Sequence, residues 1–239
     1  MRTLALIAAL SAAGVANATI VTQWNFNSDP PDSSSTTGSL VPNIGTGTAS
    51  LFGGATGTFA SGTVNGGSTD TAPTDNTAWN TSTYAPQSTG SGERGVQFAV
   101  STVGITDGIF VTFDIRHSNT SSRFVQFQYT TDGTTWTTAG LTLNGVAFDG
   151  IFEGTAGDTW FNNRRVDLFD IPGVLNNAAF AFRLTPVFGP AGGYVAASPT
   201  GTYNTSGTLR YDMVTVQTPA PGAVALLGLG GLVMARRRR

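Results

Sequence analysis

The sequence contains no cysteine, no lysine and a single histidine, His117. Without cysteine there can be no disulfide, thiolate metal ligand or cysteine nucleophile, so the fold must be held by its core, with or without a metal ion. Charged residues make up 11% of the chain, against about 25% in typical soluble domains. With 31 glycines and much Ser, Thr and Asn, this composition favours a β-rich extracellular protein.

The few charges are unevenly placed. Five of the twelve arginines lie near the two ends, at Arg2 and at 236–239, whereas all fourteen acidic residues lie between them. The stretch between the ends therefore carries a net charge of −7. Nucleic-acid binding needs clustered basic residues to replace phosphate counterions, so this charge pattern argues against a nucleic-acid partner.

The first eighteen residues have the pattern of a secretory signal peptide. Arg2 precedes an apolar run, and Ala16 and Ala18 form a small-x-small cleavage site. The sequence thus predicts a signal peptide over 1–18 with a helical core and cleavage after Ala18. A buried N-terminal helix is the alternative.

The last residues, 218–239, combine a Pro-x-Pro motif, an apolar run and a basic end. Pro219, Ala220 and Pro221 precede a Gly- and Leu-rich stretch over 222–235, and four arginines follow: Arg236, Arg237, Arg238 and Arg239. This stretch has 14 residues, whereas a stable spanning helix needs about 20. We expect a short transmembrane helix that anchors the chain transiently, with the arginines held on the cytoplasmic side.

These three parts, in this order, resemble the PEP-CTERM sorting signal of exported bacterial proteins. Ala220 stands where that family usually has glutamate. The resemblance implies a Gram-negative-type envelope, use of the secretion machinery, and processing by an exosortase-like membrane protease. The protein would be anchored in the inner membrane and then reach the cell surface or the extracellular space. A plain C-terminal anchor is the alternative.

Between the two ends the sequence predicts an all-β domain over 19–217. Apolar and polar residues alternate with period two in several segments between turn signals, as half-buried antiparallel strands require. We expect strands over 20–26, 95–100, 109–116, 124–130, 179–184 and 209–216. The fold class is an antiparallel two-sheet sandwich, jelly-roll-like, flanked by the signal helix and the C-terminal hydrophobic helix.

Two segments add detail to this sandwich. Asp132-Gly133 predicts a hairpin between 124–130 and 134–137. Residues 28–92 are rich in Gly, Ser, Thr, Asn and Pro, so we expect long loops with one or two short strands, or alternatively a disordered linker. Segments 113–136 and 209–216 loosely resemble secreted jelly-roll modules, which implies carbohydrate binding or a purely structural role.

Catalytic residues are not predicted. His117 is expected in a turn at the surface, with no nucleophile elbow around any serine. The two glutamates, Glu93 and Glu153, show no spacing that marks a glycosidase pair.

A structural calcium ion is one candidate cofactor, since carboxylate and amide oxygens are its ligands. By position, Asn27, Asp29 and Asp212 are the candidate ligands. The alternative is that Asp29 begins a turn and Asp212 faces solvent or pairs with Arg210.

Aromatic residues near loops are candidates for stacking on sugar rings, although aromatics in β-domains are more often core. We expect Trp160 to be the most exposed platform, with Trp79 and Tyr84 as further candidates, and Trp136 to be half-buried.

These features support a leading hypothesis of an exported, non-enzymatic surface or extracellular-matrix protein. The alternative is a carbohydrate- or calcium-binding extracellular module with extracellular polysaccharide as partner. A secreted hydrolase is the third possibility.

Overall fold

The computed structural model describes residues 18–72 and 74–220, of which Ile20–Thr218 form one compact unit. The described residues contain thirteen strands and one short 3-10 helix, η1 (Val64–Gly66). No helix among them is long and apolar enough to cross a membrane. The expected signal helix, the apolar run 222–235 and the terminal arginines lie outside the described residues.

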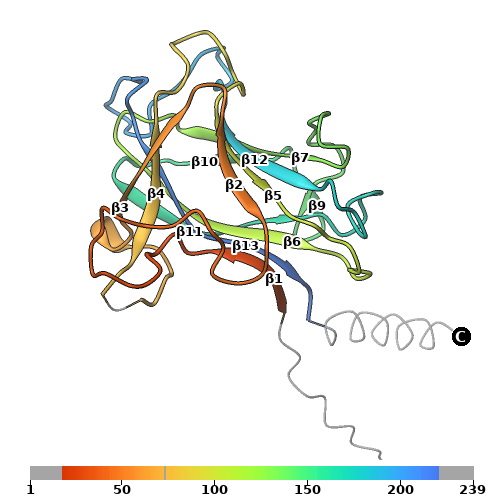
Figure 1. Cartoon of the computed structure of the whole chain (residues 1–239). Coiled ribbons are helices and arrows are strands. Elements are labelled where there is room, and N and C mark those ends of the chain that lie inside the picture. Colours follow the sequence, from red (N-terminus) through yellow and green to blue (C-terminus); the bar gives the residue numbers. More distant parts are fainter. Residues whose placement is uncertain (1–17, 73, 221–239) are drawn as a thin grey trace, which may run out of the picture. The chain divides into compact units, whose positions relative to one another are not determined.

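The strands form two antiparallel sheets, which Figure 1 shows as separate layers. The larger sheet has eight strands, and β1 is attached to it through β13. In spatial order its strands are β3 (Thr56–Ser61), β4 (Thr77–Ser82), β13 (Leu209–Thr218), β6 (Phe110–His117), β11 (Thr159–Asp167), β8 (Thr142–Leu143) and β9 (Val146–Ala147), with β1 (Thr19–Trp24) beside β13.

The smaller sheet has five strands, and β12 lies at its centre. Their order is β10 (Ile151–Glu153), β7 (Phe124–Thr130), β12 (Ala181–Pro186), β5 (Gly95–Ala99) and β2 (Thr48–Phe52). The prediction of an all-β fold with two antiparallel sheets is therefore confirmed.

A single hydrophobic core fills the space between the sheets. On the smaller sheet, Phe98 and Phe127 stack on either side of Phe182, with ring centroids 5.0 and 5.2 Å away. On the larger sheet, Val111 and Ile115 of β6 are fully buried on the inward face. Each such side chain contributes roughly 1.5–3 kcal/mol through burial, so the alternation seen in the sequence is what holds the layers together.

The glycine-rich segment 28–92 is more ordered than predicted. It contains three strands, β2, β3 and β4, where the sequence predicts one or two. β2 forms an edge of the smaller sheet, whereas β3 and β4 extend the larger one. The sequence shows little sign of β4, because three of its buried positions are Thr77, Ala78 and Thr81, which do not form an apolar pattern.

The predicted hairpin at Asp132-Gly133 is wrong in its second strand. Residues 134–137 form only one bridge, Tyr129 to Thr137, and β7 pairs with β12 and β10 instead. The turn is held locally, because an Asp132 carboxylate oxygen accepts the backbone N–H groups of Thr134 and Thr135 at 2.7 and 2.6 Å. These bonds hold the pKa of Asp132 well below its usual value.

Candidate functional site

The outward side of the five-stranded sheet carries a row of polar side chains. In β7, inward Val125 and Phe127 alternate with outward Gln126 and Gln128. The antiparallel register places Arg183 of β12 directly opposite both Gln128 and Gln97. We call the surface formed by Phe52, Gln97, Gln126, Gln128, Trp136 and Arg183 the outer face.

Arg183 lies between two aromatic rings on this outer face. Its Cζ is 4.5 Å from the Trp136 ring centroid and 4.9 Å from that of Phe52. Both contacts are within the range of cation–π attraction. Phe52, Trp136 and Arg183 are all half-buried, so the rings fix the guanidinium while part of each side chain faces solvent.

A chain of hydrogen bonds orients the amides beside Arg183. The guanidinium Nε donates to Gln128 Oε1 at 2.6 Å, Gln128 Nε2 donates to Gln126 Oε1 at 2.8 Å, and Gln126 Nε2 donates to the Asp149 carbonyl at 3.2 Å. Because each link uses one donor and one acceptor, further donors and acceptors of these groups stay available to a ligand.

A glycine makes room for Phe52. Gly95 pairs with Phe52 across β5 and β2, and a Cβ at Gly95 would lie 3.1 Å from the ring and 2.3 Å from the Leu184 carbonyl oxygen. The ring can therefore lie across β5 and reach Arg183 only because position 95 has no side chain.

The charge of Arg183 has no carboxylate partner among the described residues. Their ion pairs join Arg116 to Asp158, Arg123 to Glu153 and Arg165 to Asp167. Partial burial lowers the pKa of Arg183 from its usual value. The outer face thus presents a half-buried, uncompensated cation.

The predicted stacking residues are wrong, because all three are buried. Trp160 is 8% exposed and donates its indole N–H to the Val64 carbonyl of η1 at 2.9 Å. Trp79 and Tyr84 are 2% and 1% exposed. Trp79 packs in the core against Phe98. Sugar rings cannot reach these faces. Trp136, as expected, is half-exposed, and so is Phe52, which the sequence did not single out.

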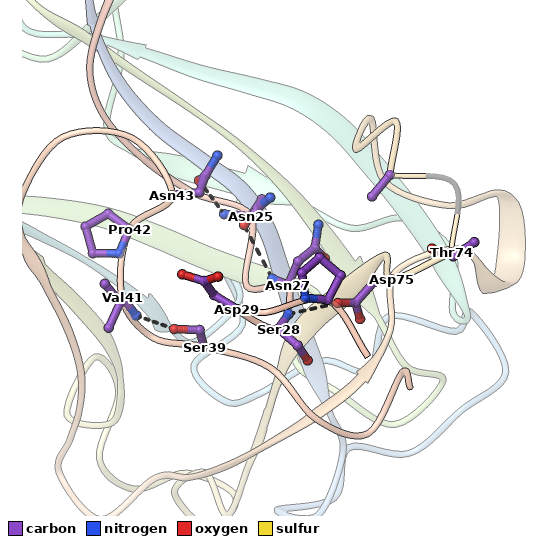
Figure 2. Close-up of a pocket in the computed structure, with 12 residues that line it drawn as sticks. Asn25, Asn27, Ser28, Asp29, Ser39, Val41, Pro42, Asn43, Thr74 and Asp75 are labelled. Carbon is purple, nitrogen blue, oxygen red and sulfur yellow. Dashed lines mark hydrogen bonds between the residues drawn. The ribbon is translucent and has the colours of Figure 1, made fainter. Parts of the chain in front are cut away.

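Two of the three candidate calcium ligands lie at one pocket, which Asp212 does not line. Asn27 and Asp29 line a pocket of about 340 Å³ (Figure 2). The Asn27 oxygen already accepts the N–H of Thr77 at 2.8 Å. Asp212 is fully buried, and its two oxygens accept bonds from Ser68 and Met213.

That pocket is lined mainly by polar groups of the first loop: Asn25, Asn27, Ser28, Asp29, Pro31, Ser39, Val41, Pro42, Asn43, Ala72, Thr74 and Asp75. Two of its side-chain amide oxygens are already engaged, since Asn43 Oδ1 accepts the backbone N–H of Asn25 and Asn25 Oδ1 accepts that of Asn27. Within the described ranges no three His, Cys, Asp or Glu side chains could hold a metal ion. A structural calcium ion stays a prediction from the sequence, since calcium also accepts amide and backbone carbonyl oxygens.

Asp114 and Asp212 lie directly opposite each other on β6 and β13, 1% and 0% exposed. The expectation that Asp212 faces solvent or pairs with Arg210 is wrong. Both aspartates serve β-bulges, whose irregular pairing frees backbone N–H groups. One Asp114 oxygen accepts the N–H of Asn163, and one Asp212 oxygen accepts that of Met213, both at 2.7 Å.

The segment before β4 covers this pair of aspartates. Ser68 donates to Asp212 at 2.6 Å, while the backbone and hydroxyl of Thr69 donate to Asp114 at 2.5 and 2.7 Å. Burial, with the nearby charges of Asp70 and Asp114, raises the pKa of Asp212 well above 3.8. Asp114 and Asp212 thus have a structural role, because they hold the segment before β4 against the sheet.

His117 is the last residue of β6 and not a surface turn residue as predicted. It is 1% exposed, its Nδ1 is hydrogen-bonded with the Ser122 carbonyl oxygen at 2.9 Å, and its ring meets Phe161 edge to face. Burial lowers the pKa of His117 to about 4. The imidazole therefore has no access to a substrate in solvent.

No protein-family model matches the chain, and no curated protein does. Several solved structures are weakly similar, and three of them illustrate the range. The CBM22-1 xylan-binding domain of Paenibacillus barcinonensis Xyn10C has 8% identity and a TM-score of 0.40, over 86% of this chain and 97% of that one. The enzymatically active domain of bacteriophage CBA120 tailspike protein 4 has 13% identity and a TM-score of 0.37, over 72% and 19%. The K3 cleaved adhesin domain of Lys-gingipain from Porphyromonas gingivalis has 13% identity and a TM-score of 0.34, over 71% and 91%. At these values the similarities carry no conclusion about function.

Proposed function

We propose that this protein is an exported, non-enzymatic carbohydrate-binding module whose site is the outer face of the five-stranded, jelly-roll-like sheet. The observation that carries the proposal is the row Gln97–Arg183–Gln128, in which Arg183 contacts the rings of Phe52 and Trp136.

The chemistry of the outer face suits sugars. A sugar ring presents hydroxyls, which both donate and accept, and amide side chains offer both functions. It also presents apolar C–H surface, which packs on partly exposed aromatic rings. Because the strands lie side by side, the row can contact successive units of a polymer. Gln97, Gln128 and Arg183 lie on strands with a fixed register, so these side chains lose little conformational freedom on binding.

Binding of the purified protein to a panel of polysaccharides, measured by pull-down and by calorimetry, tests this proposal. The Trp136→Ala substitution is expected to weaken binding about tenfold, because one stacking contact contributes up to about 1.5 kcal/mol. Gln97→Ala should also weaken it. Gln217→Ala, a matched change on the other sheet, should not. If no polysaccharide is retained, or if all three variants behave alike, the proposal fails.

We further propose that the signal peptide and the tail deliver this module. The support is the order of three parts in 218–239, a Pro-x-Pro motif, an apolar run and four arginines. A reporter carrying this tail, expressed in a host with an exosortase-like protease, should be held in the membrane and then released by cleavage. The same reporter with Arg236–Arg239 changed to Gln is the control. A tail that neither retains nor releases the reporter contradicts this delivery route.

A further inference from the structure

We infer that the ligand of the outer face is an acidic polysaccharide, whose carboxylate or sulfate group pairs with Arg183. This inference rests on the proposed carbohydrate-binding function and names its ligand class. It follows from how Arg183 differs from the other arginines of the compact unit.

Among the described residues, every other arginine has its charge or its terminal nitrogens engaged. Arg116, Arg123 and Arg165 pair with carboxylates. From their terminal nitrogens, Arg94, Arg164 and Arg210 donate to the backbone carbonyls of Thr83, Glu153 and Ser61, respectively. Arg183 uses only Nε, toward the neutral amide of Gln128. Its two terminal NH2 groups have no protein partner within that part of the chain.

The guanidinium of Arg183 is also held in a fixed orientation that suits an anion. A planar guanidinium binds carboxylate and sulfate through two parallel N–H···O bonds, which are about twice as strong as neutral hydrogen bonds. The rings of Phe52 and Trp136 and the bond to Gln128 hold its plane in place. Partial burial has removed part of its hydration, as its lowered pKa reflects. An anionic ligand would stabilise the charge of Arg183 in place of the lost water, whereas a neutral hydroxyl would do so only in part.

The overall charge makes this pairing selective. The chain between its ends has seven arginines against fourteen acidic residues, so it repels polyanions at long range. Binding of an acidic polymer then depends on the local pair at Arg183 and not on a general basic surface. We therefore expect sharp dependence on this one side chain.

Calorimetry with three oligosaccharide probes tests the inference on the full chain. The probes are oligogalacturonate, the same oligomer with its carboxyls methyl-esterified, and a sulfated galactan oligomer. We expect the free acid to bind at least tenfold more tightly than its methyl ester. A preference for the sulfated probe over the ester instead would identify sulfate as the anion and support the same pairing.

Three variants test whether Arg183 is the residue that discriminates the free acid from its methyl ester. Arg183→Gln should bind acid and ester equally, and Arg183→Lys should keep part of the preference, because it retains the charge but not the bidentate geometry. Arg210→Gln removes the same charge from the larger sheet and should keep the full preference. Thermal unfolding of each variant verifies folding.

Two results separate this inference from the proposed function. If ester, acid and sulfated probes bind equally, Arg183 contacts hydroxyls, so the inference is overturned while carbohydrate binding stands. If none of these probes, and no neutral polysaccharide, binds, the proposed function fails as well.

Discussion

At the scale of single residues, the buried carboxyl groups of Asp114 and Asp212 differ in whether they need their negative charge. Both Asp114 oxygens accept from N–H groups, of Asn163 and Thr69, so both must remain acceptors. Asp212 accepts one N–H, from Met213, and its second oxygen meets the hydroxyl of Ser68, which can reverse its direction. Asp212 therefore does not need its charge.

Asp212→Asn is expected to raise stability at pH 7, and Asp114→Asn to lower it. The folded pKa of Asp212 lies above its unfolded value, so the wild type loses stability as pH rises from about 3.8 through the folded pKa. The amide removes that loss. In Asp114→Asn, an NH2 group would face an N–H donor, at a cost on the order of 1–3 kcal/mol.

Urea unfolding of the two variants at pH 7, with the wild type beside them, measures this difference. Destabilisation of both by equal amounts would show that Asp212 is charged and needed as such in the folded protein.

The burial of His117 predicts that the folded protein loses stability in acid. Its folded pKa of about 4 lies below the unfolded value of 6.5, so the folded state binds fewer protons between these values. Stability is then fully present above pH 6.5, and about 3 kcal/mol is lost as pH falls toward 4. The His117→Gln variant should lack this part of the pH dependence.

The measurement is the free energy of unfolding at half-unit steps from pH 4 to 7.5 for both proteins. The difference between the two curves isolates His117 from the carboxylates. A difference that does not change with pH would contradict the burial argument.

At the scale of elements, the sequence predicts strands in which large apolar side chains recur at alternate positions, and it predicts β13 despite the bulge between Asp212 and Thr215. β6 and β7 have large apolar side chains at every second position, so they were predicted within one residue of their observed ends. β11 was missed because a bulge between Phe161 and Arg164 breaks the period and residues 162–165 are all polar. Asn162 and Asn163 stand at that bulge, and one extra residue reverses which side chains face inward.

The packing of β2 against β5 predicts a sharp contrast between two glycines. Gly95→Ala should destabilise the protein by roughly 1–3 kcal/mol, because the new Cβ would meet the Leu184 carbonyl at 2.3 Å and the Phe52 ring at 3.1 Å. Gly193→Ala should be close to neutral, since its Cβ would find nothing nearer than 3.6 Å. Differential scanning calorimetry of both variants measures the effect, and equal melting temperatures would contradict the proposed close packing.

At the scale of the whole molecule, fold class follows from the sequence and the candidate site does not. Period-two alternation suffices to predict two antiparallel sheets around one core. The outer face joins Phe52, Trp136 and Arg183, which are far apart in the chain and meet only through the pairing of the strands and the loop after β7. The outward glutamines of β7 were visible as the polar half of an alternation, but nothing local showed that Arg183 would lie opposite Gln128.

The stacking residues were predicted wrongly because contacts between distant segments cannot be inferred from local sequence patterns. Trp160 stands beside the polar pair Asn162 and Asn163, which suggested exposure. In the fold its ring is covered by η1, nearly a hundred residues earlier in the chain. Burial of one large side chain by a distant segment is a tertiary property, so no local pattern predicts it.

Carbohydrate binding by the outer face of the five-stranded sheet is the function that we propose. Its most direct test is an NMR titration of the isotope-labelled protein with the oligosaccharide that binds most tightly. We expect the side-chain signals of Gln97, Gln128, Arg183 and Trp136 to shift together and to saturate with one affinity. Shifts confined to the pocket around Asn25 and Asp29, with these four unchanged, would contradict it.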